Sequence, residues 1–275
     1  MMKKVFALVL FASVICSLSA QKVKETVTVF GKEQITGFTI NINDATPDIV
    51  AGALADKFEN QYALKGSKKK GFHVYENQPC VAFGEARYDI YFTTAEVGKK
   101  KDKTTQVTLV VSTGNLNCIT FSNDPRTSRN IVSFLEKLPQ DVEAYKIKLR
   151  INELKKNLNN LEKEKQNLLK EQTKMQDKLN VTNDEIKKIS EQLDAKNAEI
   201  NAMQEEFNTS HDAALQDQIA TANKERQSLQ KSQQSKQNSL LNINNNLQKL
   251  KTKLDTNQKN TEDAEAELKS LEKQQ

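Results

Sequence analysis

Residues 151–207 decide the architecture, and they read INELKKNLNNLEKEKQNLLKEQTKMQDKLNVTNDEIKKISEQLDAKNAEINAMQEEF. Apolar residues recur in this stretch at alternating steps of four and three, with Ile151 at position a and Leu154 at position d of a heptad. No glycine or proline occurs between Asp141 and Gln275, so nothing in this part of the chain interrupts a helix. The pattern predicts coiled-coil helix over residues 141–275.

A second apolar run begins at Leu215 and is out of phase with the first. The slip falls in residues 208–212, which are rich in the residue types that cap helix N-termini. The arms 141–207 and 213–275 are nearly equal, so a turn near 208–212 would lay them together as an antiparallel hairpin, each arm about 95 Å long. One unbroken helix that dimerises in parallel is the alternative. The hairpin is favoured because the slip coincides with capping residues at the midpoint.

Several positions of the heptad seam carry polar residues where leucine would bind more tightly. In an antiparallel hairpin, Lys196 would lie opposite the region of Arg226, and Thr182 opposite residues 236–240. Polar seam residues lower stability, but they can set the register or the number of helices when they match across the interface. The polar residues at these positions are Lys165, Gln172, Lys196, Arg226, Gln233 and Lys236.

Residues 21–140 are a different kind of chain, because all eight glycines and all four prolines lie at or before Pro139. Thr46-Pro47 predicts the start of a helix that Gly66 would end, and Asp124-Pro125 predicts the start of a closing helix, after which Pro139 marks the joint with the coil. Alternating apolar and polar residues predict strands at 26–30, 35–42, 71–75, 80–83, 87–95, 104–112 and 116–121. The predicted fold class is α+β: a small, mainly antiparallel sheet domain with helices on one face, followed by the long all-α antiparallel coiled-coil hairpin.

Residues 1–20 have the pattern of a secretory signal peptide. Lys3 and Lys4 precede an apolar run over 5–15, and small residues follow it up to Ala20. We therefore expect an exported protein, periplasmic or extracellular and associated with the cell envelope, with domains at 21–140 and 141–275. No other apolar run is long enough to span a membrane, which predicts no transmembrane segment in the mature chain.

The charge balance argues against a nucleic-acid partner. The formal net charge is +5, and removing Lys3 and Lys4 leaves +3. Residues 141–275 carry 23 basic and 23 acidic side chains, so the small excess belongs to residues 21–140. A nucleic-acid-binding protein is expected to show a basic stripe that this chain lacks.

Few residues are candidates for chemistry. Cys80 and Cys118 are the cysteines left after signal removal, and two arrangements are open: a disulfide between two predicted strands, or two separate buried thiols. His73 and His211 have no further ligands at metal spacing, and no phosphate-binding glycine loop or nucleophile elbow occurs. The chain is predicted not to be an enzyme and to need no cofactor or metal.

Two clusters of lysines lie in predicted connections between strands. If both face the same end of the sheet, they would form a patch that attracts an anionic envelope polymer or lipid head group. The favoured alternative is solvated loop tips, or edge lysines that block strand pairing. The clusters contain Lys68, Lys69, Lys70, Lys99, Lys100, Lys101 and Lys103.

The order of the parts resembles a class of exported bacterial proteins with no assigned activity, in which a signal peptide and a small α+β head precede a long coiled-coil hairpin. The residues that carry the resemblance are Val27 to Gly31, the helix start at Thr46-Pro47 and the heptads after Asp141. A looser likeness links the chain to the Skp/OmpH periplasmic chaperones, whose helical arms are inserted into a β body instead of following it.

We expect a structural or protein-interaction protein that uses its coiled coil as a spacer, a partner-binding rod or a self-association device. A holdase chaperone that clasps unfolded proteins is one alternative, and it would need a wide apolar surface on the arms. A ligand-binding head on a coiled-coil stalk is another, and it would need a concave site within residues 21–140.

Overall fold

A computed structural model describes residues 22–99 and 103–274. The predicted signal peptide, residues 1–20, lies outside the described residues. The chain divides into two compact units, of which the first extends to Arg150 and the second covers Ile151–Gln274. This division lies beyond the predicted boundary at residue 140, because Val142 and Tyr145 still pack on the core of the first unit.

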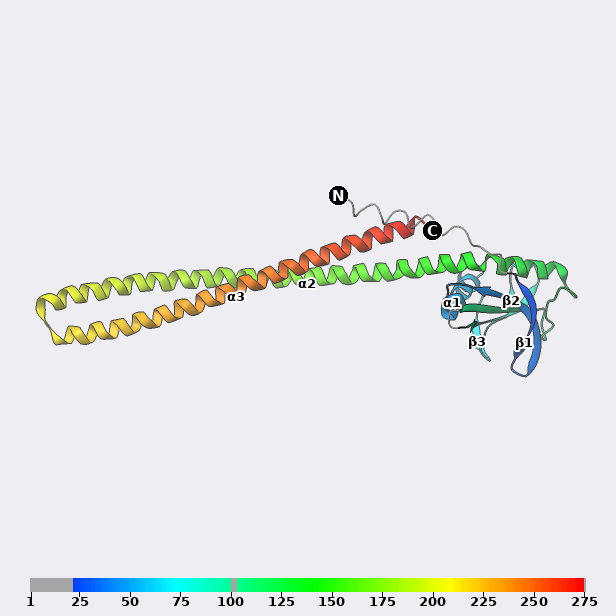
Figure 1. Cartoon of the computed structure of the whole chain (residues 1–275), viewed down its shortest axis with the longest axis horizontal. Helices are drawn as coiled ribbons and strands as arrows, with labels where there is room; N and C mark the ends of the chain where they lie inside the picture. Colours follow the sequence, from blue (N-terminus) through cyan, green and yellow to red (C-terminus); the bar gives the residue numbers. More distant parts are fainter. Residues whose placement is uncertain (1–21, 100–102, 275) are drawn as a thin grey trace. The chain divides into compact units, whose positions relative to one another are not determined.

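A six-stranded antiparallel sheet forms the centre of the first unit (Figure 1). The order of the strands across the sheet is β1-β2-β6-β5-β4-β3. They are β1 Lys24–Phe30, β2 Glu33–Ile42, β3 Ser67–Lys69, β4 Phe72–Pro79, β5 Arg87–Val97 and β6 Thr104–Ser112. The predicted α+β class with a mainly antiparallel sheet is therefore confirmed.

Two predicted strands are wrong, and one strand was not predicted. Residues 80–83 form a turn in which the backbone N–H groups of Phe83 and Gly84 donate to the Cys80 carbonyl. Residues 116–121 contribute only an isolated bridge between Cys118 and Ser112. β3 was not predicted because its three residues, Ser-Lys-Lys, include no apolar residue, so they show no alternation of apolar and polar side chains.

α1, Pro47–Asp56, starts as predicted. Thr46 is the N-cap, and its hydroxyl accepts a hydrogen bond from the Ile49 N–H at 3.4 Å. The helix ends before Gly66, passing into one turn of π-helix, η1 Lys57–Gln61. Lys57 and Phe58, which are consecutive, are both buried in this wider turn.

α2, Pro125–Ser210, also starts as predicted, because the Asp124 carboxylate accepts from the Thr127 N–H at 3.0 Å. The joint predicted at Pro139 does not interrupt the helix, since α2 continues through this residue. Proline has no N–H to donate to the carbonyl four residues earlier, that of Leu135. Leu135, Leu138 and Val142 are fully buried, and their packing holds the helix on both sides of the proline.

The sheet has a hydrophobic cluster on each face. The larger cluster contains the buried residues of α1 and of the first part of α2, together with Ile90 and Phe92 of β5. The smaller one contains Tyr91, which points to the opposite face because side chains alternate along a strand. It is formed by residues of the strands, so the helices of the first unit pack on one face of the sheet.

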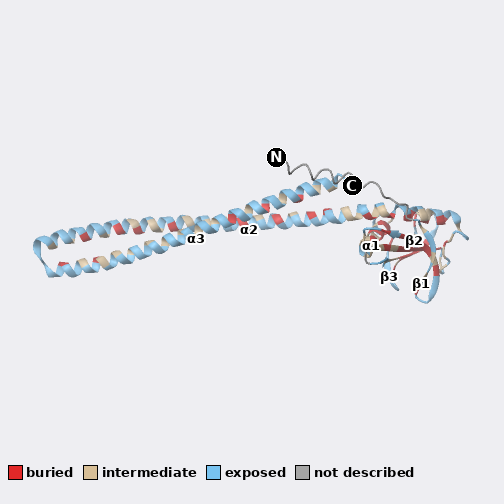
Figure 2. Ribbon diagram, viewed as in Figure 1, coloured by how far each residue is buried: buried red, intermediate tan, exposed pale blue. Residues whose placement is uncertain are grey.

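The second unit consists of α2 beyond Ile151 and of α3, Ala213–Glu272. Between these helices His211 has a φ of +55°, and the Asp212 carboxylate accepts from the Ala214 N–H at 2.8 Å as the N-cap of α3. The break thus falls where the heptad phase slips. Buried positions follow one another along both helices, with exposed positions between them (Figure 2).

Side-chain contacts between α2 and α3 follow opposite directions in the two helices. Lys196 pairs with Glu225, Glu185 with Lys236, and Glu164 accepts from Asn257. Between the first and second contacts the residue number falls by eleven in α2 and rises by eleven in α3. Between the second and third contacts it falls and rises by twenty-one. The spacing is therefore the same in both helices over this range.

Candidate functional site

The first predicted lysine cluster lies on β3 and on the turn into β4. Lys69 pairs with Glu76 at 2.6 Å, and the Lys70 ammonium lies 4.6 Å from the centroid of the Phe30 ring. Lys68 is exposed and lies opposite His73 in the β3–β4 ladder. Two of the three lysines are therefore engaged by groups of the same unit.

The second predicted lysine cluster follows β5. Lys103 pairs with Glu96 at 2.5 Å, and Lys99 is exposed. Lys100 and Lys101 lie outside the described residues. With Lys69 and Lys103 both neutralised by carboxylates, Lys68, Lys70 and Lys99 remain as the described lysines without an ion pair in these two clusters.

Cys80 and Cys118 are free thiols. Cys80 is buried in the larger core cluster, whereas Cys118 packs against the smaller cluster on the other face of the sheet. Of the two arrangements left open by the sequence, the structure has the separate thiols. Burial raises the pKa of both, so neither is favoured as a thiolate at neutral pH.

The first unit contains an ion pair that spacing did not reveal. Lys57 of η1 pairs with Asp141 of α2, although the two are separated by 84 positions in the chain. The Lys57 ammonium also lies 5.0 Å from the centroid of the Phe134 ring. Because a cation among apolar groups is costly unless it is paired, this contact ties α2 to the π-helical turn.

A second group of titratable side chains lies between η1 and β4. The Tyr75 hydroxyl donates to Glu59 at 3.1 Å, and His73 stacks on Phe92 with ring centroids 4.5 Å apart. Burial raises the pKa of Tyr75, and the Glu59 carboxylate raises it further. Burial lowers the pKa of His73, and the charge of Lys68 lowers it further. These contacts join a buried aromatic network and present no arranged nucleophile and base.

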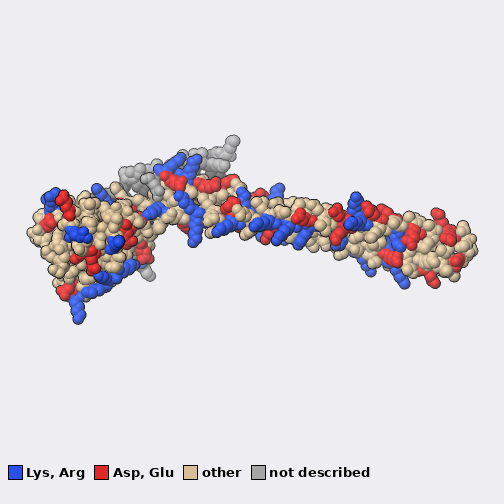
Figure 3. All heavy atoms as spheres, turned by 180° about the vertical axis from the view of Figure 1, so that it is seen from behind, with Lys and Arg blue, Asp and Glu red and all other residues tan. Residues whose placement is uncertain are grey.

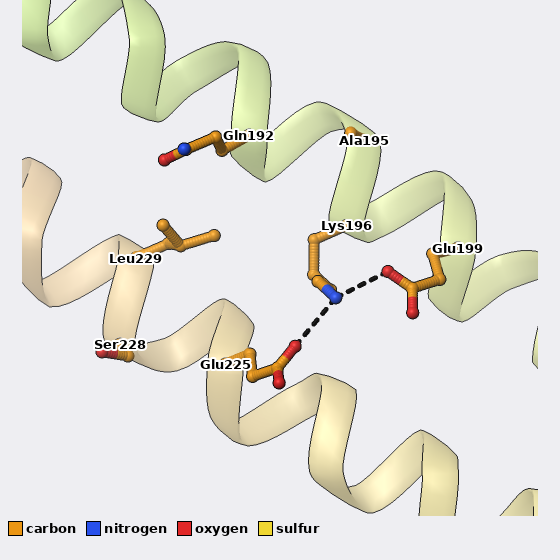
Figure 4. A pocket seen from close by; sticks show the side chains of 7 residues that line it. All are labelled: Gln192, Ala195, Lys196, Glu199, Glu225, Ser228 and Leu229. Carbon is orange, nitrogen blue, oxygen red and sulfur yellow. Dashed lines mark ion pairs between the residues drawn. The ribbon is translucent and has the colours of Figure 1, made fainter.

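A hollow of about 480 Å³ lies between α2 and α3 (Figure 4). The Lys196 ammonium sits in it between two carboxylates, 2.6 Å from Glu199 on its own helix and 2.8 Å from Glu225 on the other. The hydrogen bond to Glu199, and then that to Glu225, raises the pKa of Lys196. The other residues that line the hollow are Gln192, Ala195, Ser228 and Leu229.

Asn257 forms a second polar layer between the two helices. It is 3% exposed, and its Nδ2 donates to the Leu161 carbonyl at 3.0 Å and to Glu164 at 3.2 Å. Its Oδ1 is buried and has no hydrogen-bond partner among the described residues. The Asn257 side-chain amide is therefore held only by the hydrogen bonds that its Nδ2 donates.

The surface of the second unit mixes both signs of charge. On the face shown in Figure 3, both blue and red atoms occur along the two helices. The large apolar residues exposed on this unit are scattered singly: Leu169, Val181 and Leu241. Single exposed apolar residues are ordinary on a protein surface.

Within the described ranges, no set of three or more His, Cys, Asp or Glu side chains is placed to hold a metal ion. No helix of the described part is both long and apolar enough to cross a membrane. Comparisons with family models, with curated proteins and with solved structures found no match.

The sequence located Lys196 on the seam but did not identify its partner. The expected region opposite Lys196 was that of Arg226, and the residue that binds it, Glu225, is the neighbour of Arg226. Glu225 lies just outside the heptad positions, so the heptad pattern does not identify it. A search for opposite charges flanking the seam would have found it.

Proposed function

We propose that this chain is a non-enzymatic structural or protein-interaction protein, in which α2 and α3 form an antiparallel coiled-coil hairpin that serves as a spacer or association device. The observation that carries the proposal is the matched set of polar contacts in the seam. Lys196 with Glu225 and Glu164 with Asn257 are partners across the two helices, at the same spacing along each helix. Such contacts favour one register over others.

Localisation in the cell envelope belongs to the same proposal. It rests on the sequence pattern of residues 1–20, which is that of a secretory signal. Residues 141–275 carry equal numbers of basic and acidic side chains. Such a surface is suited to a partner that is recognised by its shape and by individual contacts, and less to one attracted by a large net charge. The scattered exposed apolar residues of the second unit favour this function over a holdase, which needs a wide apolar surface.

The hairpin itself is tested by labelling Ala195→Cys and Ser228→Cys together, in a chain without residues 1–20 and with Cys80 and Cys118 replaced by alanine. Both positions line the same hollow, so spin labels should lie close together within one chain. In one unbroken helix they would be separated by about 50 Å. Labels that stay that far apart within single chains would disprove the hairpin.

The association function is tested with a seam variant and a matched surface variant. Ile200 is 2% exposed, so Ile200→Asp should disrupt the packing of α2 on α3, whereas Leu241→Asp changes a side chain that is 62% exposed. We expect the wild type and Leu241→Asp to capture the same protein from an envelope extract, and Ile200→Asp to lose it. Equal capture by all three would show that the helices are not the binding element.

A further inference from the structure

The two edges of the sheet differ in length and in chemistry. β3 has three exposed residues, two of them lysines, and a short charged edge resists pairing with another strand. β1 has seven residues and presents Val27, which is 63% exposed, and Val29, which is 57% exposed. An edge strand with exposed valines and no proline is a place where a further strand can add.

The geometry of the β1–β2 hairpin determines which backbone groups are free. The hairpin turns through Gly31 and Lys32 between the paired residues Phe30 and Glu33. In a two-residue hairpin the flanking residues exchange hydrogen bonds, and this alternates along the strand. The N–H and C=O groups of Glu25, Val27 and Val29 therefore point away from β2, toward the open edge.

We propose that β1 pairs with β1 of a second copy of this chain, antiparallel and about a two-fold axis at Val27. This register sets Val27 opposite Val27 of the second copy, and Glu25 opposite Val29 of the second copy. The backbone groups that point outward then face one another and can all be satisfied. The exposed valines of both copies come together on one face of the joined sheet.

Charge complementarity favours a second copy over an unrelated strand. In this register Lys24 lies opposite Phe30 of the second copy, whose own ladder partner is Glu33. Lys24 and Glu33 of the second copy are then two strands apart on the same face, with about 10 Å between their Cα atoms. Two long side chains can bridge that distance beside the Phe30 ring of the second copy, over which its own Lys70 ammonium lies.

Within one copy these two charges cannot meet. Lys24 is the ladder partner of Thr39, six residues along β2 from Glu33, which is about 20 Å of strand. Among the described residues, no ion pair joins either of them to another side chain. The attraction between Lys24 and Glu33 therefore arises only when two copies pair.

The interface is small, so the expected dimer dissociates in the micromolar range. Sedimentation of the full chain without residues 1–20 should show a monomer–dimer equilibrium. Val27→Lys sets two like charges on the two-fold axis and should weaken the dimer more than about tenfold. Val81→Lys is the matched control, because Val81 is 81% exposed in a turn away from β1 and its replacement should change nothing.

A charge exchange tests the register. Lys24→Glu alone and Glu33→Lys alone should each weaken the dimer, and the double variant should restore it, because the pair is rebuilt with the signs reversed. A wild type that stays monomeric overturns the proposal and leaves the edge to an extended segment of another protein. A dimer that persists unchanged in Val27→Lys, or a double variant that is no better than the single ones, overturns it as well.

Cross-linking separates this interface from association through the helices. With Cys80 and Cys118 replaced by alanine, Val27→Cys should be linked between copies by a short bismaleimide, whereas Val81→Cys should not. Adding Ile200→Asp should leave the link at position 27 intact, because the strand pair does not depend on the seam. Equal linking at positions 27 and 81 would show random collision instead of pairing.

Discussion

Replacing Asn257 by leucine should stabilise the second unit, and the contacts of the amide give the size of the effect. Asn257 is 3% exposed, and its Oδ1 has no partner among the described residues. A buried polar atom without a partner costs about 1–3 kcal/mol, which the variant recovers. A buried leucine side chain adds about 1.5–3 kcal/mol by leaving water.

The same replacement removes the hydrogen bond that Asn257 donates to the Leu161 carbonyl and the one it donates to Glu164. The first contributes about 1 kcal/mol, and its loss leaves no orphan acceptor, because a carbonyl inside a helix already accepts from the next turn. Glu164 is exposed and can bind water instead. The net gain should be about 2 kcal/mol, or about 4–8 °C in melting temperature.

Thermal unfolding followed by circular dichroism of the full chain measures the gain. Asn260→Leu is the matched control, because Asn260 is exposed three residues farther along α3, and it should change stability by less than about 0.5 kcal/mol. A melting temperature lowered by Asn257→Leu would mean that the donated hydrogen bonds outweigh the orphan oxygen. That result would refute the reasoning given above.

Three further changes address the first unit. Asp141→Ala leaves the Lys57 ammonium buried without its partner and should cost about 3 kcal/mol in chemical denaturation, with a smaller cost for the double change to Lys57→Met and Asp141→Leu; equal costs would contradict this. Pro139→Ala restores a helix hydrogen bond and should raise the free energy of unfolding, by up to about 3 kcal/mol; a loss would show that α2 needs the proline. The hydrogen bond from the Thr127 backbone N–H lowers the pKa of Asp124 below its usual value. The stabilisation of α2 by this carboxylate, about 1 kcal/mol, is therefore present above the usual pKa and is lost as pH falls through the lowered pKa. The difference in stability between wild type and Asp124→Ala should shrink in acid, and a constant difference would contradict this.

Features determined by neighbouring residues were predictable from the sequence. The N-caps of α1 and α2 are Thr46 and Asp124, each acting on a backbone N–H three residues later. The break between α2 and α3 falls where the heptads change phase. Asp212, which lies in this segment, is the N-cap of α3. The α+β class followed from strands that alternate and a helical stretch without glycine or proline.

Features that depend on distant residues were missed. Pro139 reads locally as a helix end, but the burial of Leu135, Leu138 and Val142 overrides that signal. The apolar residues 80–83 predict a strand. They form a turn instead, and this turn places the Phe83 side chain in the core. The ion pair between Lys57 and Asp141 joins residues that no spacing rule connects.

The polar layers explain how a helix pair with a repetitive seam can hold one register. Leucine and isoleucine seams look alike after every seven residues, so a slide of one heptad costs an apolar seam little. The same slide would carry Asn257 away from the Leu161 carbonyl and leave its buried amide unpaired, at a cost of about 1–3 kcal/mol. It would also separate Lys196 from Glu225. An all-leucine seam would therefore bind more tightly while holding one register less strictly.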